Sequence, residues 1–451
     1  MDKQQETIEL GSKPVGKLLV RYAIPSVIAM TASSLYNTID SIFIGQGVGP
    51  LGISGLAITF PLMNLTAAFG AAVGIGASTC LSVKFGQKDY GTAMHVLGNS
   101  VSLNLIVGFV VGIACLLFLK PILLFFGASE LTLPYAYDYM KVILLGNPIT
   151  QLYLGLNYVM RASGKPRHAM GATIFAVLLN VVLAPLFIWV FHWGIEGAAI
   201  ATVMAQLTAL IGEIRIMRDK SYVVHLGRGI YQMKGAIIRN IVAVGMAPFV
   251  LNVCACVVVI FINYGMVKYG GDMAVGAYGI VNKVSFLFLM INMGLNQGMQ
   301  PIIGYNYGAK HTGRLMRALK LAMVAGTVIL SSGFLLAMFA PEPCVRLFTT
   351  DDELVQLSVH GIRIVMMMYP IVGCQMVIAN FFMSIGMARI SMFMATSRQL
   401  LFLVPLLIFL PRMFGIDGVW ASIPVADALS AIVAIVLLLT NLKKVKQQTM
   451  A

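Results

Sequence analysis

Long apolar runs, separated by short polar segments rich in Gly, Lys and Arg, recur along the whole chain. Most runs reach or exceed the roughly 20 residues that a helix needs to cross a bilayer. Hydropathy of this kind predicts membrane-spanning helices. We predict twelve spans, near residues 18–44, 51–82, 92–119, 134–159, 167–191, 195–217, 236–266, 274–304, 314–340, 353–385, 390–410 and 416–441.

Composition supports this interpretation and excludes a soluble protein. Of the 451 residues, 59% are hydrophobic and 11% are charged, and the mean hydropathy is +0.88. A soluble domain of this composition would expose too much apolar surface, so the chain is predicted to be an all-α, multi-pass membrane protein. The opening residues 1–17, "MDKQQETIELGSKPVGK", lack the features of a cleaved secretory signal, so the first span is expected to remain as an anchor.

The net charge of +14 reports orientation. The basic residues do not interleave with aromatics on a soluble segment, as a nucleic-acid surface would require. The predicted topology places 24 of the 31 Lys and Arg residues on one side, Arg389 and Arg398 among them. This bias puts both termini in the cytoplasm. The seven other basic residues are Lys120, Lys141, Lys268, Lys283, Arg346, Arg363 and Arg412.

The two halves of the chain resemble each other. The segment "KFGQKDYGTAMHVL" at 84–97 matches "NYGAKHTGRLMRAL" at 306–319, an offset of 222 residues. Likewise "GIEGAAIAT" at 194–202 matches "GIDGVWASI" at 415–423, shifted by 221. Since each half has an even number of spans, the halves should be related by a pseudo-two-fold axis along the membrane normal, an arrangement typical of transporters.

The repeat defines the predicted domains. These are a cytoplasmic segment at 1–17, an N-lobe at 18–217, a basic cytoplasmic linker at 218–235, a C-lobe at 236–441 and a cytoplasmic tail at 442–451.

Proline and glycine positions predict kinks and close packing within the spans. Pro25 and its counterpart Pro248 lie inside predicted helices, where a missing N–H donor permits a bend, and we consider them candidate gating positions. The GxxxG spacings at 70–74 and 294–298 allow two helix backbones to approach closely.

Three ionisable residues in spans are candidates for function. Asp40 lies in "LYNTIDSIFIG" within the first span, where a lipid-facing carboxylate would be costly, so it should face the protein interior. In the C-lobe we predict that Lys283 and Asp427 form a buried ion pair. This pair could lock the helices or take part in substrate or proton handling. Asp427 corresponds to Gln206 in the first half, so the repeat does not explain it.

No signature of an enzyme is present. The sequence lacks H-E-x-x-H, G-x-S-x-G and G-x-x-x-x-G-K-[ST], and its six cysteines contain no C-x-x-C. We therefore expect no catalytic residues, no metal site and no cofactor. A channel is also disfavoured, because the sequence "GNPIT" at 146–150 is too weak a signal for a selectivity filter.

The sequence resembles the multidrug and toxic compound extrusion (MATE) family, in the branch that includes the DNA-damage-inducible efflux proteins. "LYNTIDSIFIG" looks like that family's first helix, and "NVVLAPLFI" followed by "GIEGAAIAT" looks like its fifth and sixth. The resemblance implies export of amphipathic, usually cationic compounds, driven by an inward gradient of H⁺ or Na⁺. It also implies the inner membrane of a bacterium. We expect a monomer that contacts only membrane lipid and small amphipathic substrates, with no nucleic acid.

The resemblance also implies a cation site in the N-lobe. Its members would be Asp40 on the first helix, Asn180 on the fifth, Thr202 on the sixth, and Tyr139 on the fourth. The family usually has a second Asp where this chain has Ala184. A hard cation such as Na⁺ prefers several oxygen ligands, whereas a proton needs one carboxylate. The departure at Ala184 therefore favours H⁺ as the coupling ion.

A flippase for lipid-linked sugars is the alternative, because such proteins share the general design. An interior lined with many Arg and Lys residues to hold phosphates would favour it. The predicted spans contain few cations, so drug-type export is the first hypothesis.

Overall fold

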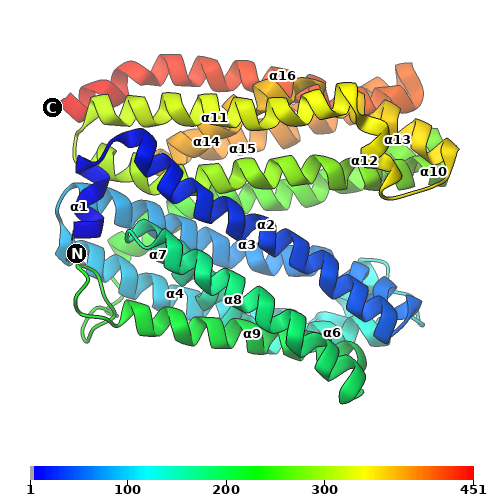
Figure 1. Cartoon of the computed structure of the whole chain (residues 1–451), viewed down its shortest axis with the longest axis horizontal. Helices are drawn as coiled ribbons and strands as arrows, with labels where there is room; N and C mark the ends of the chain where they lie inside the picture. Colours follow the sequence, from blue (N-terminus) through cyan, green and yellow to red (C-terminus); the bar gives the residue numbers. More distant parts are fainter. Residues whose placement is uncertain (1–4, 451) are drawn as a thin grey trace. The chain divides into compact units, whose positions relative to one another are not determined.

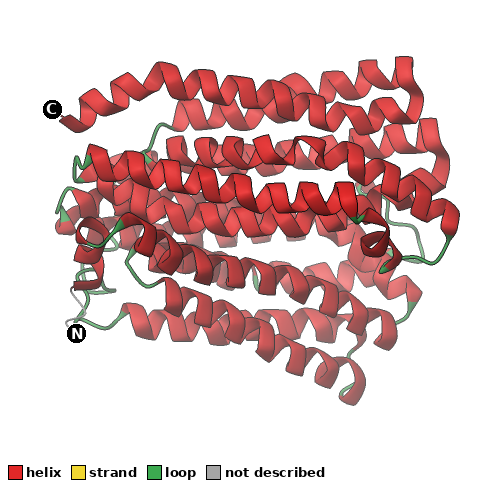
Figure 2. Cartoon of the chain, turned by 45° about the horizontal axis from the view of Figure 1, so that its top comes forward, coloured by secondary structure: helices red, strands yellow, loops and turns green. Residues whose placement is uncertain are grey.

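The computed structural model describes residues 5–450, without the side chains at 5–8, 37, 38, 272 and 450. Residues 1–4 of the predicted N-terminal segment and residue 451 of the predicted tail lie outside the described residues. Within the described range every regular element is a helix (Figure 1, Figure 2). These are α1 (Gln5–Ser12), α2 (Val15–Gly47), α3 (Pro50–Gly86), α4 (Tyr90–Leu117), α5 (Leu119–Phe125), α6 (Leu133–Leu145), α7 (Asn147–Ala162), α8 (Pro166–Pro185), η1 (Leu186–Val190), α9 (Gly194–Met217), α10 (Gly235–Gly308), α11 (Thr312–Phe339), α12 (Pro341–Arg346), α13 (Asp352–Val365), η2 (Met366–Met368), α14 (Tyr369–Ser384), α15 (Ala388–Thr396), η3 (Ser397–Leu403) and α16 (Val404–Met450).

The helices account for the twelve predicted spans. Ten helical stretches of the described chain are long and apolar enough to cross a membrane. The last stretch, Ala388–Thr449, contains two spans, because the chain reverses at Gly415, where φ is 58°. Gly271, with φ 68°, separates the two spans of α10 in the same way. Both turns need the left-handed backbone that glycine adopts readily. The short helices α6 and α7 together supply the fourth span.

The repeat predicted from the sequence extends to backbone conformation. Before α4, Lys88 has φ 58° and Asp89 has φ −87°, ψ 71°. Before α11, Lys310 has φ 57° and His311 again has φ −87°, ψ 71°. The same turn therefore starts the third span of each half, although the capping residues differ.

Only the first of these turns has a side-chain cap. The Asp89 carboxylate accepts a hydrogen bond from the backbone N–H of Thr92 at 3.1 Å and another from Lys84 Nζ at 3.1 Å. The hydrogen bonds from Thr92, followed by the contact with Lys84, lower the pKa of Asp89. The cap is thus a carboxylate that stays ionised, as the positive end of a helix favours.

Contacts divide the chain into two compact units that differ from the predicted lobes at two places. Unit 1 comprises residues 1–13 and 28–249, and unit 2 comprises residues 14–27 and 250–451. The first part of α2 thus belongs to unit 2, and the first part of α10 belongs to unit 1. Each boundary falls within three residues of a proline, Pro25 in α2 and Pro248 in α10.

Glycines in both units permit close contact between helices. In unit 1, a Cβ on Gly76 would lie 2.1 Å from the backbone oxygen of Ile241. In unit 2, a Cβ on Gly294 would lie 2.5 Å from Val27 Cα, and one on Gly298 would lie 2.5 Å from Ala23 Cα. The predicted GxxxG at 294–298 therefore packs against the first part of α2, where only glycine fits.

The predicted linker 218–235 is attached to unit 1. The Asn99 side chain on α4 donates to the carbonyl of Gln232 at 2.9 Å and accepts from the backbone N–H of Lys234 at 2.9 Å. Val224 and Ile230 bury their side chains. The segment is therefore a docked part of the fold, where its composition alone predicted a connecting strand of charge.

Candidate functional site

Asp40 is buried inside unit 1, on the second half of α2. Its side chain is 5% exposed, and its Oδ1 accepts no hydrogen bond from the described residues. A buried oxygen without a donor is costly, and such a group in a membrane helix is presumed functional. The prediction that Asp40 faces the protein interior is consistent with this placement.

A hydrogen-bonded cluster lies beside this carboxylate and joins three helices. Asn180 on α8 donates from Nδ2 to Thr202 Oγ1 on α9 at 3.0 Å and to the Tyr36 hydroxyl on α2 at 3.3 Å. The hydroxyls of Tyr36 and Thr202 are 2.8 Å apart. The structure thus brings together Asn180 and Thr202, which the family resemblance singled out, and adds Tyr36.

The donors and acceptors of this cluster can be assigned individually. Thr202 Oγ1 donates to the Ala198 carbonyl at 3.1 Å, so its proton is used within its own helix. Its two lone pairs then accept from Asn180 and from Tyr36, which must donate its own proton to Thr202. Both acceptor positions of Thr202 are therefore occupied by protein donors. Asp40 is the one member left with an unused acceptor.

Tyr139 on α6 completes the surroundings. Its side chain is 1% exposed and approaches Thr202, within electrostatic range of Asp40 and Tyr36. Ala184, at the position where the family usually has a second Asp, is fully buried in the same apolar cluster as Ile44 and Phe187. The site therefore contains one carboxylate, two tyrosines, an amide and a hydroxyl.

Sequence reasoning missed Tyr36, although a signal was present. Tyr36 precedes Asp40 by four residues, and residues four apart lie on the same face of a helix. A buried polar residue at i−4 from a buried carboxylate was therefore a candidate partner.

The predicted ion pair between Lys283 and Asp427 is wrong. Asp427 accepts instead from Arg398 Nε at 2.7 Å, and its side chain is 1% exposed. Lys283 is exposed, with its Nζ 5.8 Å from the ring centroid of Phe348. Hydropathy locates Lys283 along its helix but does not fix how that helix is rotated, so the pairing could not be inferred. Arg398 lies in η3, inside a span, and is therefore not the cytoplasmic charge that the topology assigned.

A second buried polar cluster, centred on Asn157 of α7, was not predicted. Asn157 Nδ2 donates to Glu213 Oε1 on α9 at 2.9 Å and to Thr173 Oγ1 on α8 at 3.3 Å. Arg161 Nη2 donates to Asn157 Oδ1 at 2.6 Å. Opposite charges on Arg161 and Glu213 balance each other through this amide, an arrangement that ties three helices together.

No group of three or more His, Cys, Asp or Glu side chains suited to a metal ion occurs within the range that the structure describes. The Asp40 cluster offers hydrogen-bonding groups and one ionisable acceptor.

Twelve spans in two repeated halves, with an ionisable cluster buried in one of them, define a multi-pass membrane protein built like a secondary transporter. The sequence model of the MatE family matches residues 25–186 and again residues 248–408, which is more than half of the chain. The chain therefore belongs to the MATE family. The double match also confirms the internal repeat.

Relatives cover almost the full chain. It is 27% identical to the multidrug export protein MepA of Staphylococcus haemolyticus over 96% of its own length and 95% of the relative's. Among solved structures, the MATE multidrug transporter DinF-BH in complex with rhodamine 6G is 35% identical, with a TM-score of 0.89 over 97% of this chain and 98% of that one. An outward-facing multidrug resistance MATE transporter has a TM-score of 0.92 at 23% identity, over 99% of both chains, which shows the same fold.

Proposed function

We propose that this protein is an antiporter that exports amphipathic, cationic small molecules by alternating access, driven by an inward H⁺ gradient. The observation that carries the proposal is Asp40, a buried carboxylate with an unused acceptor beside a closed hydrogen-bonded cluster. Two similar proteins support the choice of substrate. One is named a multidrug export protein, and the other was solved with rhodamine 6G, a cationic dye ester that is called the rhodamine ester below.

Two features favour H⁺ over Na⁺. Both lone pairs of Thr202 accept protein hydrogen bonds, so Thr202 offers no oxygen to a metal ion unless the cluster breaks. Ala184 removes the second carboxylate that the family usually carries at this position. Na⁺ would then have Asp40 as its only charged ligand, whereas a single carboxylate suffices for a proton.

Coupling would arise from the position of Asp40 on α2. An ionised Asp40 attracts donors in its surroundings, and a protonated Asp40 no longer does. The first part of α2, up to Val27, belongs to unit 2, while Asp40 belongs to unit 1. Protonation could therefore shift α2 at Pro25, where the helix lacks one backbone donor. Pro248 would serve α10 in the same way.

Substituting Ala184 by Asp should change the coupling ion. We expect export of the rhodamine ester by the wild type from proteoliposomes to follow an imposed pH gradient and to ignore a Na⁺ gradient at fixed pH. Ala184→Asp should gain a Na⁺ dependence, because a second carboxylate would then join Asp40. Ala184→Asn adds the same bulk without the charge and serves as the control. Wild-type export that responds only to Na⁺ would rule out proton coupling.

We further propose a bacterial inner membrane location with both termini in the cytoplasm, and unit 2 offers a test of the orientation. Thr312 Oγ1, at the start of α11, donates to Thr449 Oγ1 in the C-terminal tail at 2.6 Å. In Figure 1 the helix α12, which contains Cys344, lies at the far end of α11 from that tail. Cys344 and the tail should therefore face opposite sides of the membrane.

Cys344 as the only cysteine should react with a membrane-impermeant maleimide in intact cells. A cysteine placed at Ser221, which is exposed in the linker, should react only after lysis. Mass spectrometry of the purified protein would measure both. The reverse pattern would invert the proposed orientation.

A further inference from the structure

Unit 2 contains one buried ion pair whose two partners differ in accessibility. The Asp427 side chain on α16 is 1% exposed, whereas that of Arg398 on η3 is 28% exposed. The charge that reaches the surface of this unit is therefore the positive one. A cation placed in a membrane helix is costly, so it is expected to have a role beyond filling space.

The bond to Asp427 uses only part of the guanidinium. Arg398 Nε donates to Asp427 Oδ1 at 2.7 Å, and no further hydrogen bond of Arg398 is found in the described chain. The two terminal nitrogens Nη1 and Nη2 remain, and their N–H groups point in parallel from the end of the fork. This is the geometry in which arginine binds a carboxylate through two hydrogen bonds.

The local backbone presents this side chain in an unusual way. Arg398 lies in the π-helical segment η3 (Ser397–Leu403), which interrupts the helix that continues as α16. π-helical turns inside α-helices are frequent at functional sites, because the extra residue re-aims a side chain. In unit 1 the π-helical segment η1 (Leu186–Val190) comes at the end of α8 and contains no ionisable residue.

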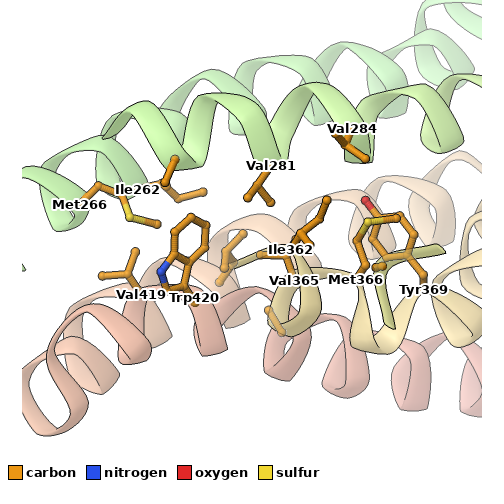
Figure 3. Close-up of a cluster of buried hydrophobic side chains, with 14 of the residues drawn as sticks. Ile262, Met266, Val281, Val284, Ile362, Val365, Met366, Tyr369, Val419 and Trp420 are labelled. Atoms are coloured by element: carbon orange, nitrogen blue, oxygen red, sulfur yellow. The ribbon is translucent and has the colours of Figure 1, made fainter. Parts of the chain in front are cut away.

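The repeat does not account for Arg398. Offsets of 220 to 222 residues place it opposite Leu178, Val177 or Ala176, all apolar. Conversely, offsets of 222 and 223 place Asp40 opposite Ile262 or Asn263, neither of which is ionisable. Figure 3 shows Ile262 of α10 within the apolar cluster around Trp420. Each unit thus carries its own buried charge, a carboxylate in unit 1 and an accessible guanidinium in unit 2.

We propose that Arg398 is a specificity-determining residue that binds the carboxylate of amphipathic substrates, so that the protein exports zwitterionic amphiphiles as well as cations. Asp427 holds the guanidinium through Nε, and the substrate carboxylate is bound by Nη1 and Nη2. The inference rests on the proposed export function and extends it to a second class of substrate.

The rhodamine ester and its free acid provide matched probes, since they differ only in the ester group that masks the carboxylate. Proteoliposomes of phosphatidylcholine containing the wild type should export both dyes. Arg398→Gln should lower export of the free acid at least about ten-fold, the loss expected for a bidentate charge-assisted pair, and change export of the ester by less than about two-fold. Asp427→Asn removes the competing carboxylate and should preserve export of the free acid.

The outcomes separate this inference from the proposed function. Export of the ester without export of the free acid by the wild type would overturn the inference and leave the function standing, whereas failure to export either dye would overturn both. If Arg398→Gln and Asp427→Asn reduce both dyes equally, the pair is only a structural lock. Arg398→Lys keeps the charge but not the fork, so it should restore the free acid only in part.

Discussion

Replacing Asp40 by asparagine is expected to reduce gradient-driven export of the rhodamine ester to the level of empty vesicles while leaving a folded protein. The two side chains are nearly isosteric, and the buried Oδ1 of Asp40 accepts no hydrogen bond in the described chain that the change would break. The amide cannot take up and release a proton, so the gradient would lose its point of action. Dye fluorescence in proteoliposomes with an imposed pH gradient measures the loss.

Asp89→Asn is the matched control for this experiment. It makes the same chemical change at a carboxylate that caps α4 outside the spans, where asparagine caps about equally well. This variant should export like the wild type, and both variants should elute as one sharp peak in size-exclusion chromatography. Undiminished export by Asp40→Asn would reduce Asp40 to a structural role and remove the basis of the coupling proposal.

Adding a single methyl group at Gly298 is expected to prevent correct packing of unit 2. The new Cβ would lie 2.5 Å from Ala23 Cα and 2.6 Å from Ala23 N, which are backbone atoms of α2 that cannot rotate away. The helices must then separate, and overpacking of this kind costs about 1–3 kcal/mol or more. We expect Gly298→Ala to yield little monodisperse protein and a lower midpoint of thermal unfolding.

Gly279→Ala on the same helix is its control. A Cβ there meets no atom within 4 Å, so this change should raise stability slightly, by up to about 1 kcal/mol, through helix propensity. Equal yields and midpoints for the two variants would show that α2 and α10 do not pack as closely as described.

The sequence was sufficient for the spans and the repeat, because both depend on patterns that hydropathy and self-comparison report directly. The N-lobe cluster was predicted through resemblance to a known family, and Asn180 and Thr202 do meet across α8 and α9. What failed was the partner of Asp427. Arg398 and Lys283 are both single cations in apolar runs, and only the rotation of their helices, set by packing, decides which one faces the carboxylate.

The contact boundaries also lay beyond the sequence. Nothing in the hydropathy of α2 indicates that Val27 and Ile28 belong to different units, because both are apolar and both lie in one continuous helix. Pro25 indicated a bend but not a change of packing partner.

The exchange of helix segments between the units has a consequence for biosynthesis and ancestry. Residues 14–27 leave the ribosome more than 200 residues before Val250, the start of the main part of the unit in which they pack. They must therefore wait in lipid without their final neighbours. A gene cut between the halves would give two fragments, each lacking a segment that the other carries. An ancestor of half the length, with the same exchange, would have folded only as a pair of chains that traded their first helices.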